Sequence, residues 1–223
     1  MNRNEDRSGG GESTGDPETI TVYSDYICPF CYLGRRSLDA YRERRDGDLG
    51  VDWQPFDLRR HKRGPDGEID DSIDDGKDDA YYTEVQRNVE KLREQYGADE
   101  MLDLEELPDG VDSLPAQAAS LYVKTEHPDR WLAFDEAVFE ALWIDGRDVG
   151  DVEVLADLAS QSGLDPEEVR DAVADEEYRD RLREAFEVAQ QHGVTGVPTF
   201  VYDDHAARGA VPPEQLERLV DGF

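Results

Sequence analysis

The feature that most constrains this chain is a pair of cysteines separated by two residues, Cys28 and Cys31, at the junction of two different patterns. The run over residues 19–24 is typical of a β-strand, and the apolar spacing over 29–45 predicts a helix. The free amide groups at a helix N-terminus favour negative charge, so the Cys28 sulfur is well placed to react as a thiolate. Cys31 follows within one helical turn, close enough to attack a mixed disulfide on Cys28. This junction predicts thiol–disulfide chemistry.

The rest of the pattern predicts an α/β protein. The further elements that we expect are a strand over 51–56, a charged loop over 57–79, helices over 80–192, strands over 199–202 and 206–210, and a helix from Pro212 or Pro213 to Val220. One apolar stripe, closed by Gly97, predicts the first of the middle helices: Tyr81, Val85, Val89, Leu92 and Tyr96. Without its helical middle this order is the thioredoxin topology.

We therefore predict a thioredoxin fold with a large all-helical insertion. The thioredoxin-like domain is expected over 19–78 and 177–223, and the insertion over 79–176. Residues 1–18 are polar and contain three consecutive glycines, so we expect a disordered tail there.

A second motif precedes the strand over 199–202. Val197 and Pro198 stand at its start, where a proline removes no hydrogen bond from the sheet. Gly193 and Gly196 bracket the motif and would let the loop approach another backbone closely. Taken alone, Pro198 could be a strand-start proline without function, and two cysteines could be half of a zinc site. In this element order, the two motifs support one another as parts of one site.

The combined motifs make the chain resemble the thioredoxin superfamily, and within it a DsbA-like branch. This branch contains the FrnE-type oxidoreductases and the 2-hydroxychromene-2-carboxylate isomerases. The resemblance extends over 19–223, and the stretches that carry it are 24–34, 53–58, 146–149, 163–165, 193–200 and 209–213. It implies that Cys28 is an exposed nucleophile and Cys31 a buried resolving cysteine. It also implies that Pro198 is a cis-proline facing the dithiol.

The resemblance further implies where a substrate would bind. The backbone of Val197 would pair with a substrate chain, and Gly196 and Pro198 belong to the same loop. Phe30 would form an apolar surface beside the nucleophile, and Pro29 and Phe30 together would help to set the redox potential.

Asp25 ends the first strand and is a candidate proton acceptor near the dithiol. A turn-forming aspartate is the simpler interpretation of the same residue. Relatives often carry an Asn-Thr…Ala-His stretch where this chain reads Asp112 through Gln117, so no histidine role is carried over. The two cysteines allow a single redox centre, and the four histidines share no metal-ligand spacing with them, so we expect no metal.

These observations predict a dithiol–disulfide oxidoreductase that acts on thiol- or disulfide-containing proteins or small molecules. It would need no cofactor beyond its own Cys28–Cys31 disulfide, with glutathione or another low-molecular-weight thiol as a candidate co-substrate. The alternative is a glutathione-dependent isomerase or transferase of the same fold, but those relatives carry serine in place of Cys28. A third interpretation is a binding module whose cysteines only pack. The direction of electron flow and the choice between monomer and homodimer stay open.

Charge limits the partners of the chain. Its 55 acidic and 24 basic residues give a net charge of −31, which repels nucleic acids and anionic membranes, so we expect neither as a partner. An acid-rich, lysine-poor composition suggests a halophile, because at about 1 M salt the Debye length shrinks to roughly 3 Å. The polar residues 1–18 do not resemble a signal peptide, and no stretch approaches the ~20 apolar residues of a membrane span. We therefore expect a cytoplasmic protein.

Overall fold

The computed structural model describes residues 18–64, 67–70, 72–74 and 76–222. The elements in chain order are β1 (Thr19–Ser24), α1 (Pro29–Arg44), β2 (Gly50–Pro55), η1 (Arg60–Lys62), α2 (Asp79–Tyr96), η2 (Leu104–Glu106), α3 (Leu114–Glu126), α4 (Pro128–Trp143), α5 (Val152–Gln161), α6 (Pro166–Ala174), α7 (Glu176–Gln191), β3 (Thr199–Tyr202), β4 (His205–Arg208) and α8 (Pro213–Asp221). This is the predicted order. The tail expected over 1–18 lies, apart from Glu18, outside the described residues.

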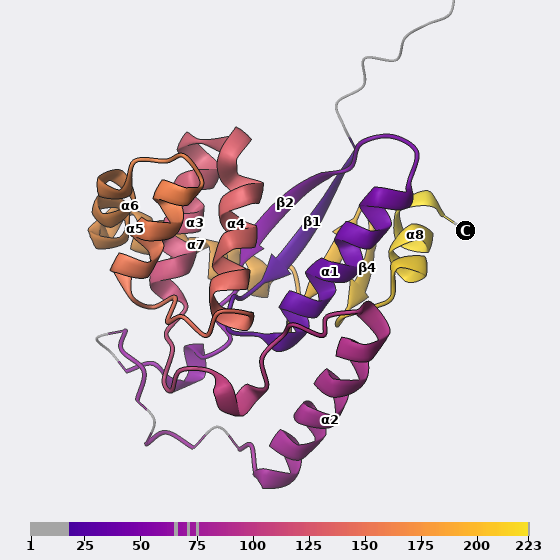
Figure 1. Cartoon of the computed structure of the whole chain (residues 1–223), viewed down its shortest axis with the longest axis horizontal. Helices are drawn as coiled ribbons and strands as arrows, with labels where there is room; N and C mark the ends of the chain where they lie inside the picture. Colours follow the sequence, from indigo (N-terminus) through magenta and orange to yellow (C-terminus); the bar gives the residue numbers. More distant parts are fainter. Residues whose placement is uncertain (1–17, 65–66, 71, 75, 223) are drawn as a thin grey trace, which may run out of the picture.

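The four strands form one mixed sheet in the order β2-β1-β3-β4 (Figure 1). β1 and β2 are parallel, so a crossover is required between them, and α1 supplies it. β3 runs antiparallel to β1 and pairs Thr199 with Tyr23. The end of β1 therefore lies beside the start of β3. Because of this, the segment after β1 and the segment before β3 lie close together at one end of the two central strands.

Helices cover both faces of the sheet. Alternation along β1 places Ile20 in one apolar cluster with Leu38 of α1 and Leu216 of α8, and Tyr23 in another with Ala189 of α7. The mixed sheet between helical layers, interrupted by helices α2 to α6, confirms the predicted thioredoxin fold with a helical insertion.

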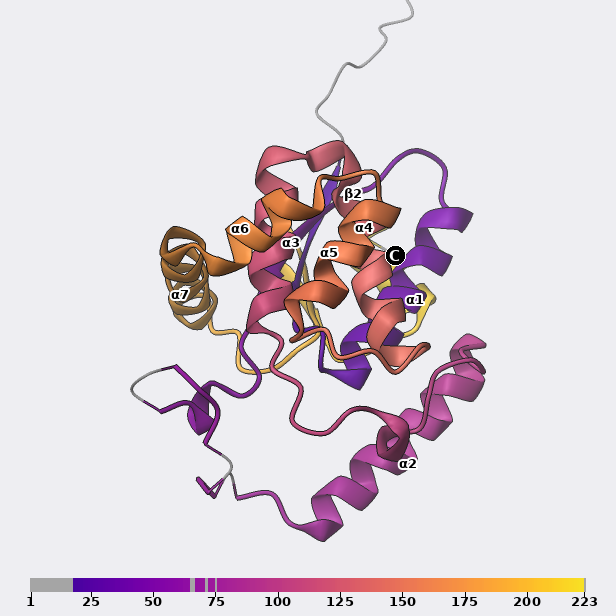
Figure 2. The same ribbon diagram turned by 60° about the vertical axis from the view of Figure 1, so that its left-hand side comes forward.

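Helices α3 to α6 pack against one another on one side of the molecule (Figure 2). Their shared core contains side chains with no exposed surface, among them Phe134, Val138, Leu155 and Val169. α2 begins at Asp79 and α7 at Glu176, close to the expected limits of the insertion, and the division into domains stays a prediction. No helix among the described residues is long and apolar enough to cross a bilayer.

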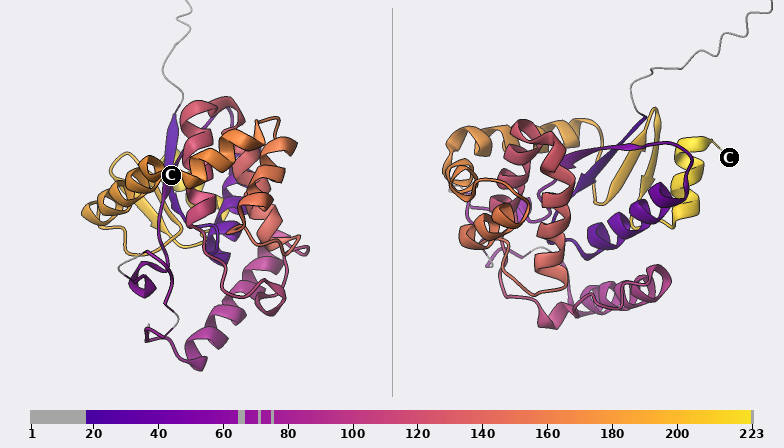
Figure 3. Two further views of the ribbon diagram at one scale, coloured as in Figure 1. Left: turned by 90° about the vertical axis from the view of Figure 1, so that its left-hand side faces the viewer. Right: turned by 45° about the horizontal axis from the view of Figure 1, so that its top comes forward.

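α2 stands apart from this helical group and lies near α1 (Figure 3). It starts at the Asp78 cap and ends at Gly97, which has the predicted left-handed conformation with φ +60°. Its apolar stripe is only partly buried: Val89 is covered, whereas Tyr81 is 45% exposed. Residues 79–87 are exposed apart from the half-buried Val85, so the stripe is covered mainly in the second half of the helix.

Candidate active site

The dithiol lies at the first turn of α1. Cys28 is the N-cap residue, and its carbonyl accepts hydrogen bonds from the amides of Cys31 at 2.9 Å and Tyr32 at 3.3 Å. Pro29 begins the helix, where its missing amide proton removes no helical hydrogen bond. Both cysteines are free thiols, and a hydrogen bond joins the Cys31 side chain to that of Cys28. The helix turn therefore brings the two sulfurs together as predicted from their spacing.

Cys28 itself is buried, with 3% of its surface exposed. The prediction of an exposed nucleophile is therefore wrong. The reason is the loop before β3: the Val197 carbonyl oxygen lies 3.6 Å from the Cys28 sulfur, within reach of a weak S–H···O hydrogen bond. Half-buried Ile27, Phe30 and Val197 pack against the apolar cluster that contains Cys28. The Cys28 sulfur therefore lies beneath this cover.

The loop before β3 faces the dithiol as the resemblance implied. The Val197–Pro198 peptide bond is cis, and the Pro198 carbonyl accepts a hydrogen bond from the Gly209 amide at 2.8 Å. Gly34 on α1 permits this close approach, because a Cβ atom there would lie 2.9 Å from Cγ of Pro198. A side chain at position 34 would push the loop and the helix apart.

The two glycines within the loop have another role than the one we expected. A Cβ atom on Gly193 or Gly196 would meet no other atom within 4 Å, so neither makes the close backbone approach predicted for them. Gly193 has φ +72°, a conformation that favours glycine, and ends the turn after α7. The Gly196 carbonyl accepts a hydrogen bond from the Thr199 hydroxyl at 2.7 Å, and the space that a Gly196 side chain would fill, next to Val197, is open.

Asp25 is completely buried at the end of β1. Its carboxylate accepts hydrogen bonds from the backbone amides of Leu58 at 2.8 Å and Ile27 at 3.2 Å, and from the side chain of Ser113. Burial nevertheless raises the pKa of Asp25 to about 6, because these bonds compensate only part of the lost hydration. Asp25 can therefore exchange a proton near neutral pH.

The Cys31 thiol is held in its protonated form by its surroundings. Burial raises the pKa of Cys31 well above its usual value, and the hydrogen bond to Cys28 raises it further. The Ser24 side chain and the Asp25 backbone hydrogen-bond to Cys31 and act in the opposite direction. The structure thus places the backbone of Asp25 against the Cys31 thiol, with its buried carboxyl in the same segment.

We expect Asp25→Asn to change how stability depends on pH. The pKa of about 6 in the folded state exceeds that of a free aspartate, so the folded protein holds the proton more tightly and loses stability as pH rises through 6. The full loss is roughly 3 kcal/mol, and about half of it falls between pH 5 and 7.5. Between these two pH values, the unfolding free energy of Asp25→Asn measured in urea should rise relative to that of the wild type by about 1.5 kcal/mol. The exposed Asp46→Asn is the matched control, and equal pH slopes for all three proteins would contradict the buried-acid assignment.

The two segments that hydrogen-bond to the Asp25 carboxyl are joined by an ion cluster, which the sequence analysis did not predict. Arg63 donates to both oxygens of Asp57, the shortest bond being 2.6 Å, and to both oxygens of Asp112 at 2.7 and 2.8 Å. Each acid directly precedes a residue that hydrogen-bonds to Asp25, Leu58 in one segment and Ser113 in the other. We call Asp57, Arg63 and Asp112 the arginine clamp, because the three residues hold these two segments together.

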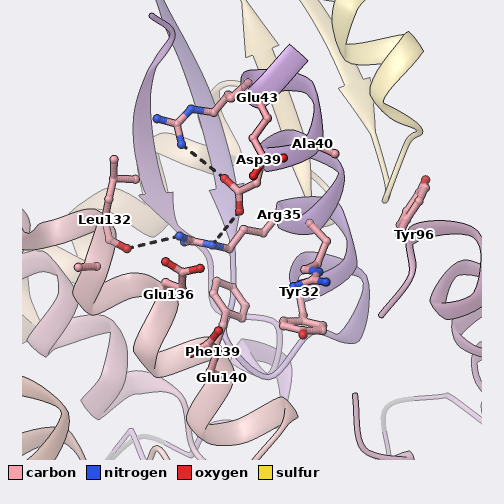
Figure 4. A pocket seen from close by; sticks show the side chains of 13 residues that line it. Tyr32, Arg35, Asp39, Ala40, Glu43, Tyr96, Leu132, Glu136, Phe139 and Glu140 are labelled. Atoms are coloured by element: carbon pink, nitrogen blue, oxygen red, sulfur yellow. Dashed lines mark hydrogen bonds and ion pairs between the residues drawn. The ribbon is translucent and has the colours of Figure 1, made fainter. Parts of the chain in front are cut away.

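A cavity of about 670 Å³ lies between α1 and α4, away from the dithiol (Figure 4). Arg35 crosses it, bonds to the Leu132 carbonyl and forms ion pairs with Asp39 and Asp135. Asp135 in turn accepts the hydroxyl of Tyr26 at 2.7 Å, which ties the segment before Cys28 to the helical insertion. Neither cysteine lines this cavity.

The histidines lie apart from the dithiol. His192 and His127 each pair with a tyrosine hydroxyl at 3.0 Å, those of Tyr23 and Tyr122. Within the part of the chain that the structure describes, no group of three or more His, Cys, Asp or Glu side chains could hold a metal ion. The groups assembled here are two thiols, a buried carboxyl and a cis-proline loop beside Cys28.

Known proteins are similar to this chain in sequence and in fold. A family model described as a DSBA-like thioredoxin domain matches residues 19–221. YwbO of Bacillus subtilis is 29% identical over 203 residues, which span 90% of this chain and 94% of that protein. The crystal structure of a probable DsbA oxidoreductase from Streptomyces coelicolor has a TM-score of 0.74 at 26% identity and covers 92% of this chain and 89% of its own. A 2-hydroxychromene-2-carboxylate isomerase has a similar fold, with a TM-score of 0.73 at 19% identity over 89% of this chain and 92% of its own.

Proposed function

The chain belongs to the DsbA-like thioredoxin domain family, and on that premise we propose that it is a thiol–disulfide oxidoreductase. The proposal rests above all on one observation: two hydrogen-bonded free thiols, Cys28 and Cys31, at a helix N-terminus beside the Val197–Pro198 loop. We assign Cys28 as the nucleophile and Cys31 as the resolving thiol. Within the DsbA-like family we favour the FrnE-type branch.

In the reducing direction, the Cys28 thiolate attacks one sulfur of a substrate disulfide. One half of the substrate leaves as a thiolate, and the other half stays joined to Cys28 as a mixed disulfide. Cys31 then gives up its proton and attacks the Cys28 sulfur, which releases the second half of the substrate and leaves a Cys28–Cys31 disulfide. Two electrons pass from the dithiol to the substrate, and the reverse sequence oxidises a substrate dithiol.

Other residues would serve these steps. Asp25 accepts the proton of Cys31, since its own pKa of about 6 suits proton transfer near neutral pH. The backbone of Val197 pairs with the substrate chain once the cover over Cys28 has moved. Pro29, Phe30, Gly196 and Pro198 form the surrounding contact surface.

The experiment that tests this function is equilibration of the protein in glutathione buffers of graded redox ratio, followed by alkylation of free thiols. We expect both thiols to disappear together with one midpoint, because the chain has only these two cysteines. The midpoint also gives the reduction potential and with it the favoured direction. Two alkylatable thiols under fully oxidising conditions would disprove the oxidoreductase.

The second candidate is a glutathione-dependent isomerase, which the shared fold with the chromene carboxylate isomerase favours. Such an enzyme would bind reduced glutathione without any change in its number of free thiols. The intact Cys28–Cys31 pair argues against it, because isomerisation does not use a second thiol.

The substrates we propose are thiol- or disulfide-containing proteins or small molecules, with glutathione or another low-molecular-weight thiol as co-substrate. DsbA-like oxidoreductases exchange electrons through their own cysteines and need no other cofactor. For the assembly we propose a monomer or a homodimer, which sedimentation would distinguish. We also propose the cytoplasm as the compartment, which fractionation of the producing cells would test.

We further propose that the chain works in concentrated salt, as a halophile protein does. With a net charge of −31, the acidic side chains of the chain repel one another. This repulsion weakens as the Debye length falls from about 10 Å at 0.1 M to about 3 Å at 1 M salt. The melting temperature should therefore rise over this range in KCl and rise much less in a non-ionic osmolyte of equal osmolality. A flat KCl curve would mean that the acidic excess serves solubility alone.

A further inference from the structure

A cavity of about 410 Å³ opens next to the dithiol, between α2 and the segment that follows β4. Its lining includes Phe30, which stands between the two cysteines, and Val197, whose carbonyl oxygen lies 3.6 Å from the Cys28 sulfur. The Tyr96 hydroxyl of α2 donates to the Ala210 carbonyl at 2.6 Å and so holds the two walls in place. A molecule seated in this cavity would lie beside the cover of the nucleophile.

The charge of this cavity is opposite to that of the molecule. Lys91 of α2 and Arg208 of β4 line it, and neither side chain has a hydrogen-bond or ion-pair partner among the described residues. None of the nine lining residues is acidic, although 55 of the 223 residues of the chain are Asp or Glu. Two unpaired cations at the entrance to a site in a strongly anionic protein mark a place where a negative group is attracted.

The remaining lining suits the rest of a small organic acid. Phe30, Leu92 and Val197 offer apolar surface, and Asn88 adds an amide at the side of α2. The volume lies within the range of pockets that hold small molecules, about 300–1,000 Å³. Such a cavity can hold a carboxylate at Lys91 and Arg208 while the carbon chain and sulfur extend towards Cys28.

We propose that this cavity binds the carboxylate of a small acidic disulfide or thiol and thereby makes such molecules the preferred substrates. The inference rests on the proposed thiol–disulfide function and adds the substrate class. Lys91 and Arg208 are specificity-determining residues in this scheme. They attract the anion that the rest of the molecule repels, and they take no part in breaking the disulfide.

Three symmetric disulfides of different charge test the proposal: glutathione disulfide is anionic, hydroxyethyl disulfide is neutral and cystamine is cationic. The reduced protein is mixed with each, and the rate of Cys28–Cys31 disulfide formation is followed by quenched alkylation. We expect Lys91→Gln/Arg208→Gln to slow the reaction with glutathione disulfide about tenfold, since each exposed charge pair contributes up to a factor of roughly five. The neutral disulfide should react at the same rate, and cystamine should react faster.

The matched control is Arg87→Gln/Arg218→Gln, which removes the same charge from α2 and α8 but outside the cavity. An equal effect of both double variants would mean that long-range charge alone is responsible, and the binding site would be disproved. The binding site would also be disproved if neither double variant changed the relative reaction rates of the three disulfides. In both cases the reaction of hydroxyethyl disulfide at Cys28 leaves the oxidoreductase intact, whereas failure of all three disulfides to react would refute the proposed function itself.

Discussion

Cys31→Ser should accumulate as a mixed disulfide with its substrate, whereas Cys28→Ser should lose exchange altogether. In the first variant the Cys28 thiolate still attacks, but no second thiol is available to release the adduct. In the second variant the remaining thiol is Cys31, which is 2% exposed and whose pKa is raised well above its usual value by burial. The exchange rate of Cys28→Ser should therefore fall to that of the uncatalysed reaction.

The measurement is mass spectrometry of each variant after incubation with hydroxyethyl disulfide, with the rate of adduct formation taken at several times. The adduct should lie on Cys28 in Cys31→Ser, at one equivalent per chain. The wild type serves as the control, because it should pass through the adduct and end as an internal disulfide. Rapid labelling of Cys31 in Cys28→Ser would reverse the assignment of the two roles.

Arg63→Gln should produce the largest loss of stability outside the apolar core. The change removes the cation of the arginine clamp and leaves Asp57, which is buried, and Asp112 facing one another. Breaking a buried ion pair by removing one partner costs about 3–5 kcal/mol, because a desolvated charge is left without compensation. Urea unfolding of the wild type and the variant at neutral pH measures this difference.

Two further variants separate the charge from the geometry of the clamp. Arg63→Lys keeps the charge but not the planar fork that holds both carboxylates, so it should lose less than Arg63→Gln. Asp57→Asn/Arg63→Gln removes the stranded buried charge and should recover part of the loss. If the double variant is as unstable as Arg63→Gln, repulsion within the clamp is not the cause.

The clamp variant also reports on the active site. The clamp holds Leu58 and Ser113 against Asp25. Arg63→Gln should therefore disturb the hydrogen bonds that stabilise the ionised form of the Asp25 carboxyl. The disulfide exchange rate of the folded variant should then depend on pH differently from the wild type. A structural role alone would lower stability and leave this pH profile unchanged.

Local signals in the sequence were sufficient for the order of elements. β1 and β3 occupy the predicted residues, and α1 and β2 deviate by one residue at their ends. Here the turn residues and the periodicity act within a few positions, which a sequence displays directly. The cysteine pair was found for the same reason, since both of its members lie in one helix turn.

Contacts between distant segments could not be predicted in this way. The cover of Val197 over Cys28 joins residues 169 positions apart, and the bond from Leu58 to Asp25 joins residues 33 positions apart. The half-exposed Tyr81 shows the same limit, since an apolar stripe indicates a buried face only if another element reaches it. Lys91 and Arg208 likewise line one cavity although they are far apart in the sequence, and the hydrogen bond from Tyr96 to Ala210 joins the two walls.

The burial of Cys28 separates the reactivity of the sulfur from access to it. A small disulfide that makes no contact beside the loop gains nothing from displacing Val197, so we expect it to react more slowly than one that binds there. A substrate that binds beside the loop can use its binding free energy to hold the open conformation, in proportion to its preference for that state. We therefore expect Cys28 to behave as a gated thiol, whose reaction rates with different partners depend on how well each partner binds beside the loop.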